Sequence, residues 1–99
     1  MDKEKREIIK FYIYENIKIL ENKRVAKEDK KIARMLIREE VDALVKRYQK
    51  AEKTKSTDLA DLEQDFKEIA NMLKSYLANP HSKRDNEIYK VYKKILFII

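Results

Sequence analysis

The chain contains no glycine, no cysteine and no tryptophan, and proline occurs once among its 99 residues. A globular chain of this length has on average about seven glycines, and tight hairpin turns and phosphate-binding loops depend on them. Their absence disfavours β-rich folds and excludes the glycine-dependent P-loop and dinucleotide-binding motifs. The lack of cysteine excludes disulfides and thiolate metal sites within the chain.

Catalytic groups are also scarce. His81 is the only histidine, and its position next to Pro80, the only proline, is best interpreted as an exposed loop. No glutamate has a histidine three residues after it, as the di-metal sites of helical bundles require. We therefore expect a protein that is not an enzyme and that has no cofactor or bound metal.

Long hydrophobic runs are missing as well. The longest, 95–99, has five residues, whereas about twenty are needed to cross a membrane. The N-terminal segment alternates charges and does not resemble a signal peptide. We expect a soluble, cytoplasmic protein. Three lysines before the apolar run would also suit a membrane-surface helix, which is the less favoured alternative.

Charged residues make up 42% of the chain, and the apolar residues between them recur at helical spacing. This spacing predicts a first helix over residues 3–21. Its apolar stripe consists of Ile9, Ile13, Ile17 and Leu20, widened by Ile8, Tyr12 and Ile19. The polar stretch 21–31 follows, and Asn22 is the expected left-handed C-cap. Because no glycine or proline marks this break, one continuous helix over 3–53 stays an alternative.

Three more helices are predicted, over residues 28–53, 58–78 and 82–99. Each carries an apolar seam with steps of three and four residues, which is the pattern of helices that pack against one another. The expected seams are Ile37, Val41, Leu44, Tyr48 and Ala51; then Leu59, Leu62, Phe66, Ile69, Leu73 and Tyr76; then Ile88, Tyr92, Ile95 and Ile99.

Local signals set the boundaries of these helices. The hydroxyl-rich stretch 53–57 predicts a loop. Asn79 precedes Pro80, and a residue before proline is pushed out of the helical region. Ser82 is the expected N-cap of the last helix, with Asp85 as its capping-box partner.

Four amphipathic segments with short connections predict an all-α fold. We expect a compact antiparallel bundle of four helices, or of three if the first two are continuous, and one domain over residues 1–99. Residues 54–79 carry a net charge of −2, whereas the other three segments are basic. One acidic segment among basic ones suits a bundle whose helices attract each other.

Two groups of side chains are candidates for a protein interface. Phe11, Tyr14 and Lys18 lie on the side of the first helix opposite its apolar stripe, and aromatic residues often anchor interfaces. At the other end, Leu96, Phe97 and Ile98 point away from the expected seam. We expect a non-enzymatic protein that binds a protein partner, including a second copy in a homodimer. An adaptor, an inhibitor or immunity-type protein, and an accessory subunit are all consistent with this.

Basic stripes on two helices suggest nucleic-acid binding as the alternative. They consist of Lys27, next to the predicted helix 28–53, with Lys31, Arg34 and Arg38 on it, and of Lys83, Lys90 and Lys94 on 82–99. Rows of cations can bind a phosphate backbone. However, Glu28, Asp42 and Glu87 lie near enough to pair with them. Any such binding is expected to be weak and independent of nucleotide sequence.

Overall fold

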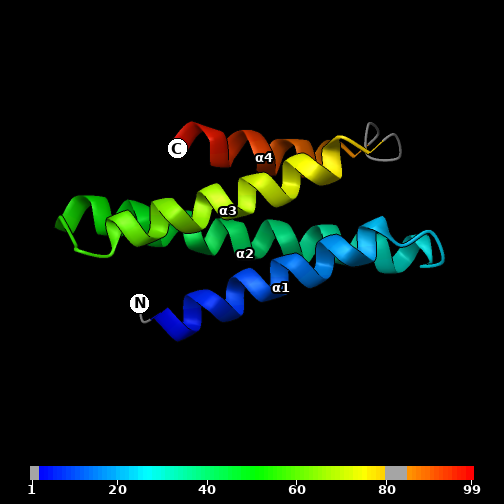
Figure 1. Ribbon diagram of the computed structural model, residues 1–99, viewed down its shortest axis with the longest axis horizontal. Coiled ribbons are helices and arrows are strands. Elements are labelled where there is room, and N and C mark those ends of the chain that lie inside the picture. The colour runs from blue at the N-terminus through cyan, green and yellow to red at the C-terminus, as the bar shows by residue number, and fades with distance from the viewer. Residues whose placement is uncertain (1–2, 80–84) are drawn as a thin grey trace.

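The computed structural model describes residues 3–79 and 85–99, and these form four helices and no strand. The helices are α1 (Lys3–Glu21), α2 (Lys27–Thr54), α3 (Leu59–Leu77) and α4 (Asn86–Ile98). Successive helices run antiparallel along the 44 Å long axis of the molecule (Figure 1). The prediction of an all-α four-helix bundle is confirmed, and the break between α1 and α2 excludes one continuous helix.

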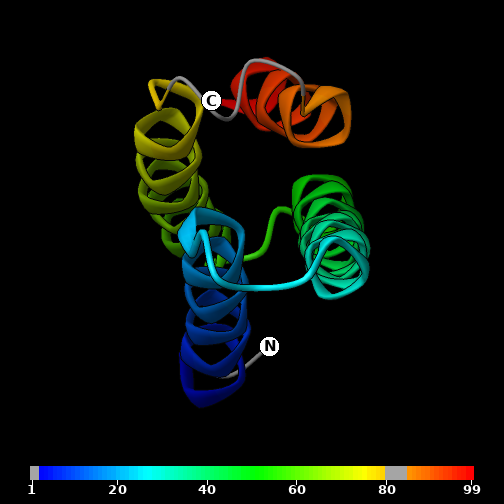
Figure 2. The ribbon, with the colours of Figure 1, turned by 90° about the vertical axis from the view of Figure 1, so that its right-hand side faces the viewer.

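The helices enclose one core. α1 and α4 lie at opposite corners of the cross-section, and each of them packs on both α2 and α3 (Figure 2). α2 is the longest element with 28 residues, whereas α4 has only 13. α4 therefore ends part way along its neighbours, and the C-terminal turns of α2 extend beyond it (Figure 1).

The seams predicted for α2 and α3 form the centre of the core. All five seam residues of α2 are buried, and so are those of α3 except Leu59, which is half-buried. Phe66 is completely buried, and its ring meets the ring of Tyr48 edge-on at 5.8 Å. The Tyr48 hydroxyl donates a hydrogen bond of 3.2 Å to Oε1 of Glu63, so its polar end is satisfied at the edge of the core.

The predicted apolar faces of α1 and α4 need correction. Ile8 and Tyr12 do not widen the buried stripe of α1, because this corner helix has neighbours only on the side of Ile13 and Ile17, and both side chains are exposed. On α4, Val91 is buried on the same side of the helix as Ile88 and Ile95. Tyr92, at the edge of that face, is half-buried, and Ile99 is exposed.

The left-handed residue expected at Asn22 lies elsewhere. Lys55, at the end of α2, has φ 52° and is the positive-φ position within the described ranges. Its backbone N–H faces the carbonyls of Ala51 and Glu52, and the Ala51 carbonyl also accepts a 2.9 Å hydrogen bond from the backbone N–H of Ser56. α1 ends differently: Oδ1 of Asn22 accepts a 2.9 Å hydrogen bond from the backbone N–H of Arg24, a local turn that competes with the helix.

The start of α4 also differs from the prediction. The helix begins at Asn86, and Asp85 is its N-cap, since Oδ1 accepts a hydrogen bond of 3.3 Å from the backbone N–H of Ile88. Asp85 is therefore not the capping-box partner of a helix that starts at Ser82. Ser82 itself lies outside the described residues, as do His81 and Lys83.

Candidate interaction surfaces

A cluster of charged side chains joins the N-terminal half of α1 to α3. Nζ of Lys10 lies 2.9 Å from both Oδ1 of Asp65 and Oε2 of Glu68. Nη1 of Arg6 lies 3.6 Å from Asp61 and 3.7 Å from Asp65. We call this the α1–α3 ionic cluster, and it comprises Arg6, Lys10, Glu7, Asp61, Asp65 and Glu68. With four carboxylates against two cations, it has an excess of two negative charges.

Burial and pairing act in opposite directions on the Lys10 ammonium. Burial alone lowers its pKa, but hydrogen bonds to Glu68, Asp65 and Glu7 outweigh that effect and hold the pKa of Lys10 well above its usual value. The same hydrogen bond from Lys10 lowers the pKa of the Glu7 carboxyl. Arg6 is buried beneath these groups, and its Nη1 has no hydrogen-bond partner within residues 3–79 and 85–99. Lys10 and Glu7 are therefore both charged at neutral pH.

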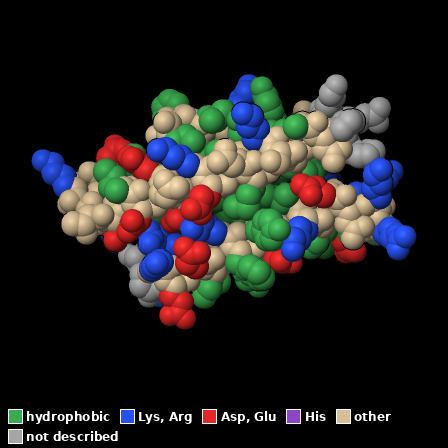
Figure 3. All heavy atoms as spheres, viewed as in Figure 1, with side chains coloured by type: hydrophobic (Ala, Val, Ile, Leu, Met, Phe, Trp, Pro, Cys, Tyr) green, Lys and Arg blue, Asp and Glu red, His purple; other side chains and the backbone are tan. Residues whose placement is uncertain are grey.

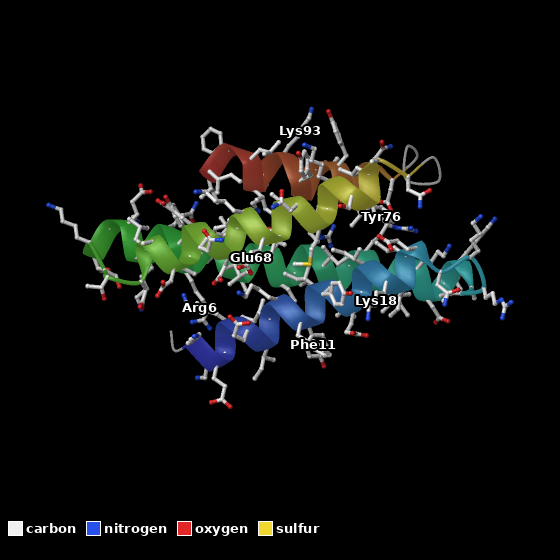
Figure 4. The ribbon with its side chains drawn as sticks, viewed as in Figure 1. Arg6, Phe11, Lys18, Glu68, Tyr76 and Lys93 are labelled. Carbon is white, nitrogen blue, oxygen red and sulfur yellow. The ribbon has the colours of Figure 1, made fainter. Side chains whose placement is uncertain are left out.

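An aromatic patch follows this cluster along α1. Phe11 and Tyr14 are 61% and 45% exposed, as expected from their position opposite the apolar stripe. Nζ of Lys18 lies 4.5 Å from the centroid of the Tyr14 ring, which is a cation–π contact, and 3.5 Å from Glu15. Figure 4 shows Phe11 and Lys18 along α1, with Arg6 toward its N-terminal end and Glu68 on the neighbouring α3.

The space-filling view shows how these groups lie on one face of the molecule. Hydrophobic side chains gather over the middle of the face, between α3 and α1 (Figure 3). Acidic and basic side chains are mixed beside them, toward the N-terminal half of α1 (Figure 3). We call this surface the α1–α3 face. It combines the α1–α3 ionic cluster with Phe11 and Tyr14.

A second apolar surface lies on α4. Phe97 is 91% exposed and Leu96 is also exposed, but Ile98 packs against the core and is not an outward anchor. Tyr89, which the sequence analysis missed, is exposed on the same side, and Nζ of Lys93 lies 4.6 Å from its ring centroid. The four-residue spacing from 89 to 93 to 97 was the signal that could have identified it. We call this surface the outer face of α4, and it comprises Tyr89, Lys90, Lys93, Leu96 and Phe97.

Phe97 also borders a shallow groove. A hollow of about 300 Å³ lies between the C-terminal halves of α2 and α4. Its lining includes Val45 and Tyr48 of α2 and Lys94, Phe97 and Ile98 of α4. The hollow lies near the point where α4 ends before α2 does (Figure 1), and Val45 and Tyr48 stay buried beside it.

The two basic stripes meet at the junction of α2 and α4. Arg38 lies 3.4 Å from Glu87, and Lys94 donates a hydrogen bond to Asp42. Lys90 is also near Glu87, at 3.9 Å. These cations therefore have carboxylate partners inside the molecule, which reduces the positive charge that the stripes offer to a phosphate backbone. Lys27 and Lys31 are exposed near the N-terminus of α2.

A polar junction holds the other end of α4 in place. Oδ2 of Asp85 accepts a 2.8 Å hydrogen bond from the Tyr76 hydroxyl and lies 3.6 Å from Nη1 of Arg34. Burial, followed by this hydrogen bond, raises the pKa of Tyr76 well above its usual value. A hollow of about 410 Å³ lies beside the junction, with Lys30 and Glu87 on its rim. Because Tyr76, Asp85 and Arg34 engage each other, the junction serves to position helices.

Metal ligands and membrane-spanning helices are two further features that would indicate a function. Across the described ranges, no group of three or more histidine and carboxylate side chains is placed to hold a metal ion. No helix there combines the length and the low charge needed to cross a bilayer. Comparisons with protein-family models, with curated proteins and with solved structures found no match. The role of the chain must therefore be inferred from its own surfaces.

Proposed function

We propose that this chain is a small non-enzymatic protein that binds a protein partner through exposed helix faces, and that it self-associates. The observation that supports this most is that exposed large apolar side chains are most numerous on α1 and on α4 with the residue after it. On α1 these are Ile8, Phe11, Tyr12 and Tyr14, and at α4 they are Tyr89, Leu96, Phe97 and Ile99, whereas α2 exposes Ile32 and Met35.

Exposed apolar groups carry an energetic cost that a partner would remove. Burying one large apolar side chain is worth about 1.5–3 kcal/mol, and Phe97 has 91% of its surface in water. Single exposed apolar residues are ordinary, but groups of them with aromatic members and a polar rim are typical of protein interfaces. Both surfaces described above have that composition.

The wider role follows the same reasoning. A bundle that offers rigid helix faces suits an adaptor, an inhibitor or immunity-type protein, or an accessory subunit, and we place it in the cytoplasm. Nucleic-acid binding is the less favoured alternative, because Arg34, Arg38 and Lys94 each lie against a carboxylate of the same molecule. The charge that remains would favour weak, non-specific contact.

Analytical ultracentrifugation of the full chain tests the proposal. We expect the wild type to show a mass above that of the 12.0 kDa monomer at submillimolar concentration. The paired change Phe11→Lys and Phe97→Lys should reduce that mass, whereas Ile32→Lys, a similar change at an exposed position of α2, should not. A wild type that stays monomeric throughout would contradict self-association.

A further inference from the structure

We infer that the contact between copies is asymmetric: the outer face of α4 of one molecule packs on the α1–α3 face of the next. This rests on the self-association proposed above. It goes further by naming the two surfaces that meet and by excluding a symmetric interface, in which the same surface of each copy would meet.

The charges of the two faces are opposite. On the outer face of α4, Lys90 and Lys93 are exposed, and the acid beside them, Glu87, is shared between Lys90 at 3.9 Å and Arg38 of α2 at 3.4 Å, so the positive charge is in excess. The α1–α3 face carries the opposite excess, because its four carboxylates outnumber Arg6, Lys10 and the nearby Lys3. Asp61 and Glu68 are exposed on that face, where the ammonium groups of a second copy can reach them beside Arg6 and Lys10.

A symmetric contact would bring like charges together. In a two-fold dimer, each surface patch meets its own copy. Two outer faces of α4 would oppose Lys90 and Lys93 to the same lysines, and two α1–α3 faces would oppose their surplus carboxylates. Like-charge juxtaposition across an interface costs several kcal/mol in general. Pairing one face with the other removes that repulsion and replaces it with attraction.

The apolar groups of the two faces are also complementary. Each face has an exposed phenylalanine, Phe97 on α4 and Phe11 on α1, with a tyrosine on the same helix face. Each tyrosine lies under a lysine ammonium, Tyr14 under Lys18 and Tyr89 under Lys93. If α4 of one copy packed along the α1–α3 face of another, Phe97 would approach Phe11 and Tyr14. The lysines of α4 would then approach the carboxylates of the α1–α3 ionic cluster.

The two faces point in different directions on the bundle. α1 and α3 form one side of the molecule, and α4 lies at a different corner (Figure 2). One copy can therefore engage two others at once. Such a head-to-tail contact produces a ring if the rotation closes and an open chain if it does not.

Two single variants test the inference when they are mixed. Phe11→Lys blocks the α1–α3 face and leaves α4 intact, whereas Phe97→Glu blocks the outer face of α4 and leaves the α1–α3 face intact. Each variant alone should be monomeric, because each lacks one half of the contact. An equimolar mixture should form a heterodimer and nothing larger, since only one intact pair of faces remains. Sedimentation velocity with one variant carrying a fluorescent label measures this.

Other results would overturn the inference in distinguishable ways. A wild type that is monomeric contradicts the proposed function itself. A wild type that associates while the mixture stays monomeric, or while either variant alone still associates, leaves the proposed function in place and contradicts the asymmetric contact. Circular dichroism checks that both variants fold, as the exposure of Phe11 and Phe97 leads us to expect.

A charge exchange provides a second test that keeps both phenylalanines. Lys93→Glu and Glu68→Lys should each weaken self-association of the chain that carries it. The chain that carries both changes should regain self-association, because the acidic and the basic partner of the contact have then exchanged positions. Raising the salt concentration should weaken wild-type association, since these charges lie at the rim. No recovery in the double variant would overturn the inference.

Discussion

The Tyr76 hydroxyl donates a 2.8 Å hydrogen bond to Oδ2 of Asp85, and this pair connects the last turn of α3 to the N-cap residue of α4. Both residues are buried, and the same carboxylate lies 3.6 Å from Nη1 of Arg34 on α2. Asp85 thus ties three helices together at one end of the bundle. It also sets the direction in which α4 leaves the loop, and with it the position of the outer face of α4.

Asp85→Ala should lower the free energy of unfolding by about 2–4 kcal/mol, because it removes an N-cap and leaves buried polar groups without their partner. Urea denaturation measures the loss. Asp85→Asn, which keeps a capping oxygen but removes the charge opposite Arg34, should cost less. Equal stability of Asp85→Ala and the wild type would contradict the role given to this residue.

Phe66→Ala should be the most costly truncation in α3. Phe66 is completely buried at the centre of the core, and large-to-small changes at such sites cost about 3–5 kcal/mol. That is a large share of the roughly 5–15 kcal/mol available to a small domain, so the melting temperature should fall steeply or the chain should unfold. Phe97→Ala is the matched control, since Phe97 is 91% exposed and its truncation should leave the monomer's stability nearly unchanged.

Stability should fall at alkaline pH. The pKa values of Tyr76, Tyr48 and Lys10 are all raised in the folded chain, so the folded state keeps protons that the unfolded state loses first. Where the unfolded state binds fewer protons, the free energy of unfolding decreases as pH rises. The decline should begin near the ordinary pKa of these groups, at about pH 10.

Urea denaturation as a function of pH measures this decline. Tyr76→Phe should reduce the slope, because one of the three titrating groups is then gone. Tyr89→Phe serves as the control, since Tyr89 is exposed and its removal should leave the slope unchanged. A stability profile that stays flat between neutral and strongly alkaline pH would show that none of the three groups is held as the structure indicates.

Nucleic-acid binding, if it occurs, should be weak, independent of sequence and largely lost at physiological salt. Each lost phosphate contact should flatten the slope of log K against log salt by about 0.9 for duplex DNA. Lys27→Glu with Lys31→Glu is a clean probe, because both side chains are exposed, whereas Arg34 lies against the buried carboxylate of Asp85. A salt-titrated anisotropy assay gives the slope. Tight binding at physiological salt that disappears in this double variant would make the protein a nucleic-acid binder.

Much of the helical framework could be predicted from the sequence because it depends on short-range patterns. The bounds of α1 agree with the prediction, and those of α2 and α3 differ by one residue at each end. The apolar residues around Phe66 recur at steps of three and four, and this spacing identifies the core-facing side of α3 without knowledge of the helices that pack against it. The exposure of Phe11 and Phe97 followed from the same periodicity, so part of each candidate interaction surface could be predicted from the sequence.

The rest was decided when the helices came together. Ile8 and Tyr12 are exposed because α1 has neighbours on one side only, and the number of neighbours is not encoded in the spacing of one helix. Asp85 caps α4 where it can also meet Tyr76 and Arg34, which belong to two other helices. Periodicity acts over one or two turns of a single helix. Burial, ion pairing and the charge left on each face depend on side chains distant in the chain, so only the packed bundle determines them.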